Sequence, residues 1–247
     1  MNALNPALQM ELLTPEQIDA AWAEAPIAYV PLGTYEFHGK HLPVGFDALA
    51  AHFLCLRAAA RTGGLVLPPL YYGTGGGHGE YPHTIMVEGA QIRPLLDRTV
   101  ERLSDFGVRI VVLLSGHFPQ EQVDLVTGAA RDLSTGTRKV IGLVTGMVKD
   151  PPIRPDHAAL FETSLMHALA PSLVHLERLP SLAEAPANDP EGNGWGAHRH
   201  DPSHVLHGIF GEDPRLLDPA KAEELVQAVE HWLVKQVVTA KVELGLL

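Results

Sequence analysis

The sequence has one cysteine, no long apolar run and no cluster of basic residues. The single Cys55 excludes an internal disulfide, and in its Ala/Leu-rich segment we expect a buried small hydrophobic residue. No apolar run reaches the roughly 18 residues that span a bilayer, and the first residues lack the basic-then-apolar pattern of a signal peptide. We therefore expect no membrane association and a cytoplasmic location.

Basic residues are scarce: 18 Lys and Arg against 29 Asp and Glu give a formal net charge of −11. Because the basic residues are scattered, we expect no nucleic-acid binding. The sequence also lacks Gly-x-Ser-x-Gly, so a serine nucleophile has little support. The glycine-rich residues 73–79 lack the Gly-Lys-Ser/Thr ending of a phosphate-binding loop.

Short apolar runs alternate with segments of helical period along all 247 residues. No repeat or linker divides the chain, so we expect a single domain over residues 1–247. The alternation predicts an α/β fold with a mainly parallel sheet covered on both faces by helices. Strands are expected at residues 27–32, 65–70, 85–87, 108–114, 139–144 and 173–176, and helices at residues 18–23, 48–61, 91–106, 120–133, 156–170 and 219–242.

Residues 33–47 place two carboxylates and two histidines within fifteen positions. Imidazole and carboxylate are ligands that suit zinc, iron or manganese, so this stretch predicts a metal site. Glu36 and His38 are two residues apart, and an extended backbone would direct both side chains to one side. Asp47 has two carboxylate oxygens that could bridge a pair of ions, or it could simply cap the following helix. His41 is either a partner of this site or a surface residue.

Polar clusters follow four of the predicted strands, at Glu36 with His38, at His78, at His117, and at residues 156–157. Ligands of open α/β sheets bind at the carboxyl ends of the strands, so we expect these segments to meet in one crevice. A pair of ions about 3.5 to 4 Å apart can activate water and polarise a carbonyl oxygen, as amide hydrolysis requires.

Plainer interpretations exist for the later residues of this set. His117 could be a histidine at a turn, and Asp156 is a natural helix N-cap. His157 and Glu162 would lie roughly 140° apart on a helix and would reach one site only from its two flanks. Glu162 lies among apolar residues, where a carboxylate needs a partner such as a metal or a substrate.

Residues 33–47 resemble the signature Gly-Ser-x-Glu-x-His-Gly-x-His-Leu-Pro-x-x-x-Asp of the creatininase (creatinine amidohydrolase) family, with Thr34 in place of Ser. The resemblance continues in order over most of the chain. The further matching segments are residues 72–78 with 82–84, 115–117, 156–158 with 162–164, and from 208 to the last helix.

The resemblance implies a three-layer α/β/α sandwich, one or two divalent ions (Zn, Mn or Fe) per subunit, and a homo-oligomer, frequently a hexamer. It implies hydrolysis of an amide bond in a cyclic or small substrate. By position, the implied metal ligands are Glu36, His38, Asp47 and His117, with Glu162 as a further ligand or acid/base group. The implied catalytic residues are His157 and Glu162, and the implied pocket residues are His41, Tyr72, His78 and His83.

The chain departs from the family pattern at several positions. Pro119 stands where creatininases proper carry a Glu ligand, so either Glu162 completes a second ion position or that position is weak or absent. Ser115 replaces Asn, His83 replaces Gly, and residues 159–160 replace a Gly-Glu pair. We therefore do not expect creatinine itself to be the substrate.

The favoured hypothesis is a metal-dependent amidohydrolase acting on a non-peptide C–N bond. The alternative is a catalytically degraded relative that binds a metal or small ligand, or serves in an assembly, which Pro119 and His83 favour. Trimming of a peptide or cofactor precursor is a third hypothesis with the same chemistry. Residues 187–210, with Trp195 and four histidines, line either the pocket or an oligomer contact, and the sequence does not decide between them.

Overall fold

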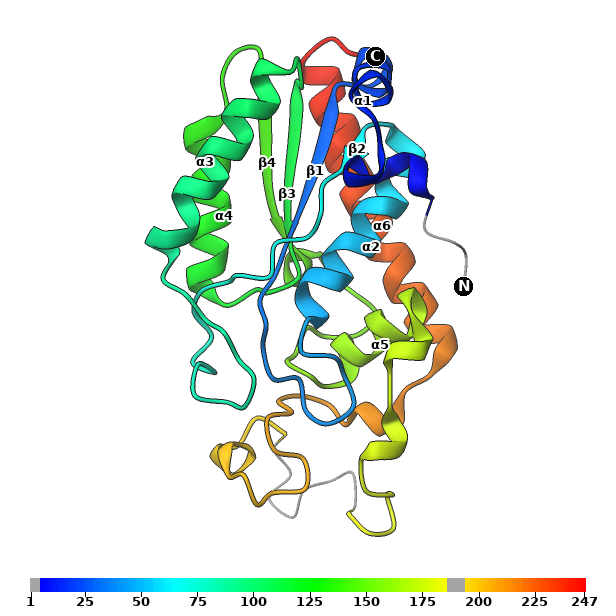
Figure 1. Ribbon diagram of the computed structural model, residues 1–247. Helices are drawn as coiled ribbons and strands as arrows, with labels where there is room; N and C mark the ends of the chain where they lie inside the picture. Colours follow the sequence, from blue (N-terminus) through cyan, green and yellow to red (C-terminus); the bar gives the residue numbers. More distant parts are fainter. Residues whose placement is uncertain (1–4, 186–193) are drawn as a thin grey trace.

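A four-stranded parallel sheet forms the centre of the computed structural model, which describes residues 5–185 and 194–247 (Figure 1). The strand order is β2-β1-β3-β4, and the strands are β1 (Ile27–Leu32), β2 (Leu65–Val66), β3 (Ile110–Ser115) and β4 (Lys139–Val144). Leu32 pairs with Ser115, which pairs with Val144, so β1, β3 and β4 end at one level. Loops that follow these strands therefore start from one edge of the sheet.

Helices cover both faces of the sheet, as Figure 1 shows. One layer holds α2 (Phe46–Thr62), α5 (Leu160–Leu169) and α6 (Pro219–Glu243). The other layer holds α3 (Gly89–Asp105) and α4 (Gln120–Leu133). The helix α1 (Pro15–Glu24) lies at the end of the sheet opposite the carboxyl ends of the strands. Leu114 packs in the first layer's core and Leu113 in the second's, because successive strand side chains point to opposite faces. This two-sided burial explains why β1 and β3 are buried throughout and almost entirely apolar.

Local signals explain most helix starts. Thr14 and Gln17 form a capping box before α1, and the Asp218 side chain accepts from Ala220 N–H at the start of α6. Of the two roles left open for Asp47, helix capping is wrong. The helix α2 begins at Phe46, two residues before the expected start, and Gly45 is its N-cap residue. None of the helices in the described ranges is long and apolar enough to cross a bilayer.

Three of the predicted strands are shortened or absent in the structure. β2 has two residues rather than six, and Leu70 meets Leu32 only as an isolated bridge. Residues 85–87 likewise contribute isolated bridges, through Ile85 and Met86. The strand predicted at residues 173–176 is wrong, because 3-10 turns occupy Pro171–Leu173 and Leu176–Arg178.

The predicted helix at residues 156–170 begins four residues late, at Leu160. His157 instead pairs with Phe210 through backbone hydrogen bonds in both directions. The Asp156 carboxylate accepts from the N–H groups of Phe161 (2.9 Å) and Glu162 (3.4 Å), so it still satisfies the helix end that it was predicted to cap. Long-range pairing and this cap together hold residues 156–159 outside the helix.

Candidate metal centre

Two glycines bring the candidate ligands together at the carboxyl edge of the sheet. A Cβ on Gly33, after β1, would lie 2.2 Å from Ala48 N, and a Cβ on Gly116, after β3, would lie 2.0 Å from the Asp47 carbonyl oxygen. Only glycine allows such backbone contacts. The start of α2 therefore packs against the ends of β1 and β3, and Asp47 lies close to both Glu36 and His117.

Glu36, Asp47 and His117 form the first cluster of possible metal ligands, which we call the first position. His117 Nδ1 lies 2.9 Å from Glu36 Oε2 and 3.3 Å from Asp47 Oδ2. All three side chains are buried. The sequence prediction that these three residues share one site thus agrees with their placement.

A second cluster, which we call the second position, surrounds His38. Its Nε2 lies 3.3 Å from Asp47 Oδ1 and 3.4 Å from Glu162 Oε2. His38, His157 and Glu162 each offer an atom that lies within 4.8 Å of the others. The expectation that His157 and Glu162 flank the site from two sides is therefore wrong, because His157 precedes the helix and is not bound by helical geometry.

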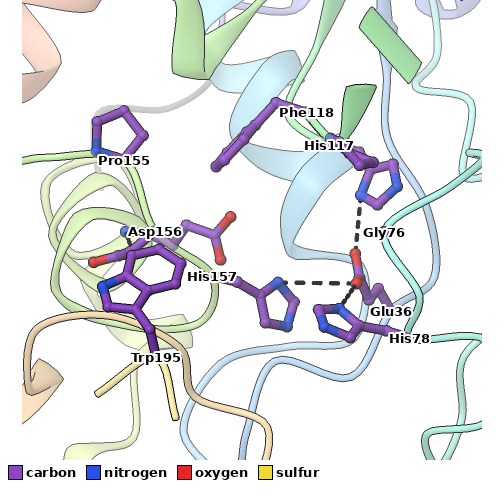
Figure 2. Close-up of a pocket in the computed structure, with 11 residues that line it drawn as sticks. Glu36, Gly76, His78, His117, Phe118, Pro155, Asp156, His157 and Trp195 are labelled. Atoms are coloured by element: carbon purple, nitrogen blue, oxygen red, sulfur yellow. Dashed lines mark hydrogen bonds and ion pairs between the residues drawn. The ribbon is translucent and has the colours of Figure 1, made fainter. Parts of the chain in front are cut away.

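Glu36 is the centre of a third contact set, which Figure 2 shows with dashed lines to three histidines. His78 Nδ1 lies 2.5 Å from Glu36 Oε1, and His157 Nδ1 lies 3.8 Å from the same oxygen. The His78 ring stacks on Phe210 at 5.3 Å between centroids. The sequence placed His78 in the pocket and gave no signal of its contact with Glu36.

Backbone carbonyls fix the protonation of three imidazoles. His38 Nδ1 donates to the Glu36 carbonyl (2.9 Å), His117 Nε2 to that of Thr74 (3.2 Å), and His157 Nε2 to that of Phe37 (3.1 Å). A carbonyl only accepts, so each of these ring nitrogens carries the hydrogen. The opposite nitrogen of each neutral ring then presents a lone pair to the carboxylates, as in histidines that bind metals.

Several of these inward atoms have no hydrogen-bond partner within the described chain. They are Glu36 Oε2, His38 Nε2 and Asp47 Oδ2. Buried electron-rich atoms in contact are unfavourable unless a cation or a proton lies between them. The separations of 3.3 and 3.4 Å equal the roughly 3.3 Å between donors around a tetrahedral ion with bonds of about 2.0 to 2.1 Å. The residues present therefore fit a divalent ion.

Without a cation, protons must neutralise this cluster. Burial lowers the pKa of His38, but Asp47 and Glu162 outweigh burial and raise it to about 10. Burial opposes the same rise at His117, whose pKa Asp47 and Glu36 bring to about 10. Burial raises the pKa of Glu162 well above its ordinary value. These histidines would therefore release protons when an ion binds.

A cavity of about 190 Å³ opens onto this cluster. Its walls include the polar side chains of His78, His117, His157 and Glu162 and the apolar side chains of Phe118, Pro155 and Trp195. Residues 187–210 were expected to line either the pocket or an oligomer contact. Trp195 lines this cavity, whereas residues 187–193 lie outside the described ranges. The sequence analysis missed Phe118 and Pro155, whose neighbours His117 and Asp156 were the available signal.

Comparison with known proteins identifies the family. Residues 11–237 match the creatininase family model, described as creatinine amidohydrolase. The chain belongs to the creatininase family. The creatininase-family resemblance predicted from residues 33–47 is thereby confirmed.

Two curated relatives carry different hydrolase names. The creatinine amidohydrolase of Pseudomonas putida is 32% identical over 176 residues, which are 62% of this chain and 68% of the relative. The mycofactocin precursor peptide peptidase of Mycobacterium ulcerans is 29% identical over 182 residues, 70% of this chain and 69% of the relative. The relatives of this chain therefore include one named for an amide substrate and one named for a peptide substrate.

Solved creatininase structures share the fold. A crystal structure of creatinine amidohydrolase (creatininase) has a TM-score of 0.72 at 28% identity and covers 93% of this chain and 96% of its own. A manganese form of creatininase has a TM-score of 0.72 at 27% identity, and the match covers 93% of this chain and 97% of that structure. A creatininase mutant of the Zn-Zn type has the same TM-score and identity, and the match covers 93% of this chain and 96% of that structure. The predicted α/β/α architecture is confirmed.

Three of the four pocket residues implied by the family resemblance do not line the cavity. His41 is fully buried behind the site, where its Nε2 contacts Thr163 Oγ1 at 2.9 Å. Tyr72 is 48% exposed, and His83 lies on an exposed turn with φ 63°. Neither lines the cavity, so of the four predicted pocket residues only His78 is placed there.

Proposed function

We propose that this chain is a metal-dependent amidohydrolase that cleaves a C–N bond of a small substrate. One observation carries the proposal: three imidazoles, each with its outer N–H bonded to a backbone carbonyl, turn bare nitrogens toward three buried carboxylates. Such a donor set suits divalent zinc, iron or manganese. Creatininase structures with Mn and of the Zn-Zn type support this choice of ions.

The first position would be held by Glu36, Asp47 and His117, and the second by His38 with Asp47 as the shared carboxylate. Asp47 suits a bridging role because Oδ2 is directed at His117 and Oδ1 at His38. Divalent ions at two such positions lower the pKa of water and polarise a carbonyl oxygen. The protein's part is to fix the carboxylates, and His78 does so by its contact with Glu36 Oε1.

Proton transfer to the leaving nitrogen requires an acid that lines the cavity. Glu162 and His157 both line it. Burial raises the pKa of Glu162 well above its ordinary value, whereas burial lowers the pKa of His157 to about 3. Glu162 is therefore the better proton donor of the two, and His157, with Nε2–H held by Phe37, offers only a bare Nδ1.

The cavity volume of about 190 Å³ supports a small substrate or the end of a larger one. A cyclic or small amide follows from the name of the Pseudomonas putida relative. A second candidate is a peptide, and the name of the Mycobacterium ulcerans relative favours it. The chemistry of bond cleavage would be the same for both.

Metal content and a substrate panel test this function together. Purified protein should contain near-stoichiometric Zn, Mn or Fe by elemental analysis, and should hydrolyse at least one member of a panel of lactams, hydantoins, formamides and short peptides. A chelator should abolish turnover and added metal should restore it. Bound metal without turnover on the whole panel would instead support a degraded member that only binds metal.

A further inference from the structure

The second position lacks a donor that the family signature supplies. Pro119 occupies the position of the acidic ligand, and although it lines the cavity, its side chain has no donor atom. His38 and Asp47 alone leave this position with two side-chain donors. A stable site for zinc or iron needs at least a third protein ligand.

Two residues from another segment approach the same point. Glu162 Oε2 lies 3.4 Å from His38 Nε2, and the His157 ring lies 4.7 Å from the His38 ring between centroids. Ligand atoms of His38, His157 and Glu162 all lie within 4.8 Å of one another. Both added residues come from the segment that precedes and opens α5.

The orientation of His157 is that of a ligand. Its Nε2–H is held by the Phe37 carbonyl, so its only lone pair is on Nδ1, which is turned toward Glu36. His78 differs, because its Nδ1 is already 2.5 Å from Glu36 Oε1, the distance of a direct hydrogen bond. Donors around one ion with bonds of about 2 Å lie further apart, near 3.3 Å.

A strained backbone holds the two residues in this arrangement. Ala158, fully buried, has φ 51°, in the left-handed region that non-glycine residues rarely adopt. Its N–H donates to Glu162 Oε2 at 2.5 Å. Asp156 accepts from the N–H groups of Phe161 and Glu162 on the next turn. Strain that is over-determined by its surroundings is typical of functional sites.

We propose that His157 replaces the missing acidic ligand, so that His38, His157 and Glu162 hold the second ion together with the shared Asp47. This inference rests on the proposed function, which requires that ions bind at all. Two imidazoles beside the carboxylates of Glu162 and Asp47 favour zinc or iron(II) over manganese. A Glu162 that binds the ion through Oε2 is an ionised carboxylate, so in this arrangement it acts as a ligand and not as the proton donor.

Ion stoichiometry tests the inference without measuring turnover. Wild-type protein should bind two Zn²⁺ per chain in equilibrium dialysis, and His157→Ala should bind one, with affinity for the second ion at least 100-fold weaker. His200→Ala is the matched control and should keep two, since His200 is an exposed imidazole that contacts His78 and Tyr81 but no carboxylate of the site. Adding Pro119→Glu to His157→Ala should restore two.

Two ions in His157→Ala would overturn the inference, as would failure of Pro119→Glu to restore the second. If His157→Ala does not fold, the Co²⁺-loaded wild-type protein tests instead whether His157 binds an ion. Its paramagnetic NMR spectrum should show three exchangeable imidazole N–H signals, from His38, His117 and His157, and two would contradict the proposal. A wild type that binds no Zn²⁺ would instead refute the proposed function itself.

Discussion

The first and second positions share Asp47 but are built differently. The first takes its ligands from segments directly after β1 and β3, and the glycine contacts at Gly33 and Gly116 fix their spacing. The second takes His157 and Glu162 from the segment at the start of α5, which is held by capping and one strained residue. The first position is thus anchored on the ends of two strands, whereas the second is completed by a segment distant in the sequence.

Removal of Asp47 should have the largest effect, because this carboxylate reaches both positions. Asp47→Ala should lose both ions and lower hydrolysis by roughly 10³-fold or more, since activation of water and of the carbonyl are lost together. Elemental analysis and turnover on the best panel substrate measure this. Asp97→Ala is the control, since Asp97 is a half-buried aspartate on α3 that pairs with Arg93 far from both positions. Full metal content in Asp47→Ala would contradict a shared ligand.

Loss of His117 should separate the two positions. His117→Ala removes a donor of the first position only, so we expect one ion to remain per chain, at the second position. Equilibrium dialysis with Zn²⁺ should be run on His117→Ala, on His157→Ala and on the variant that carries both changes. Each single variant should keep one ion, and the double variant should keep none. Two bound ions per chain in His117→Ala would show that the first position does not need His117.

Metal affinity should rise with pH. Despite burial, the carboxylates raise the pKa of His38 and His117 to about 10, so below that pH an ion must displace a proton from each. Affinity should increase by about tenfold per displaced proton per pH unit between roughly pH 6.5 and 8.5. Because these folded-state pKa values exceed the ordinary 6.5, the metal-free protein gains stability from both groups below pH 6.5 and loses it as the pH rises toward 10. Calorimetric Zn²⁺ titrations that show no pH dependence would contradict this protonation.

The smallest effect is expected from His78, which orients Glu36 rather than completing a position. His78→Ala should weaken Zn²⁺ at the first position by about 10- to 100-fold, as for other residues that orient metal ligands, and leave the second unchanged. Competition with a chromophoric chelator resolves the two affinities. His78→Gln, which can still donate to Glu36 Oε1, should recover part of the loss; equal weakening of both positions would argue against this role.

Much of the fold was predictable from apolar periodicity. β1, α4 and β4 have the bounds expected from the sequence. β2 was overestimated because Pro68 and Pro69 cannot donate to a sheet ladder. The late start of α5 depends on pairing with Phe210, a contact that no local pattern reveals. The single domain, the cytoplasmic location and the hexamer stay predictions.

The sequence by itself determined the ligand types of the first position, because Glu36, Asp47 and His117 lie in motifs tied to strand ends whose meeting a parallel sheet dictates. Tertiary structure alone decided that His157 and Glu162 face His38, that His78 holds Glu36, and that His41, Tyr72 and His83 lie elsewhere. The physical reason is that sequence spacing fixes side-chain direction within a helix or strand, whereas direction in loops is set by long-range backbone pairing and by carbonyls contributed from distant residues.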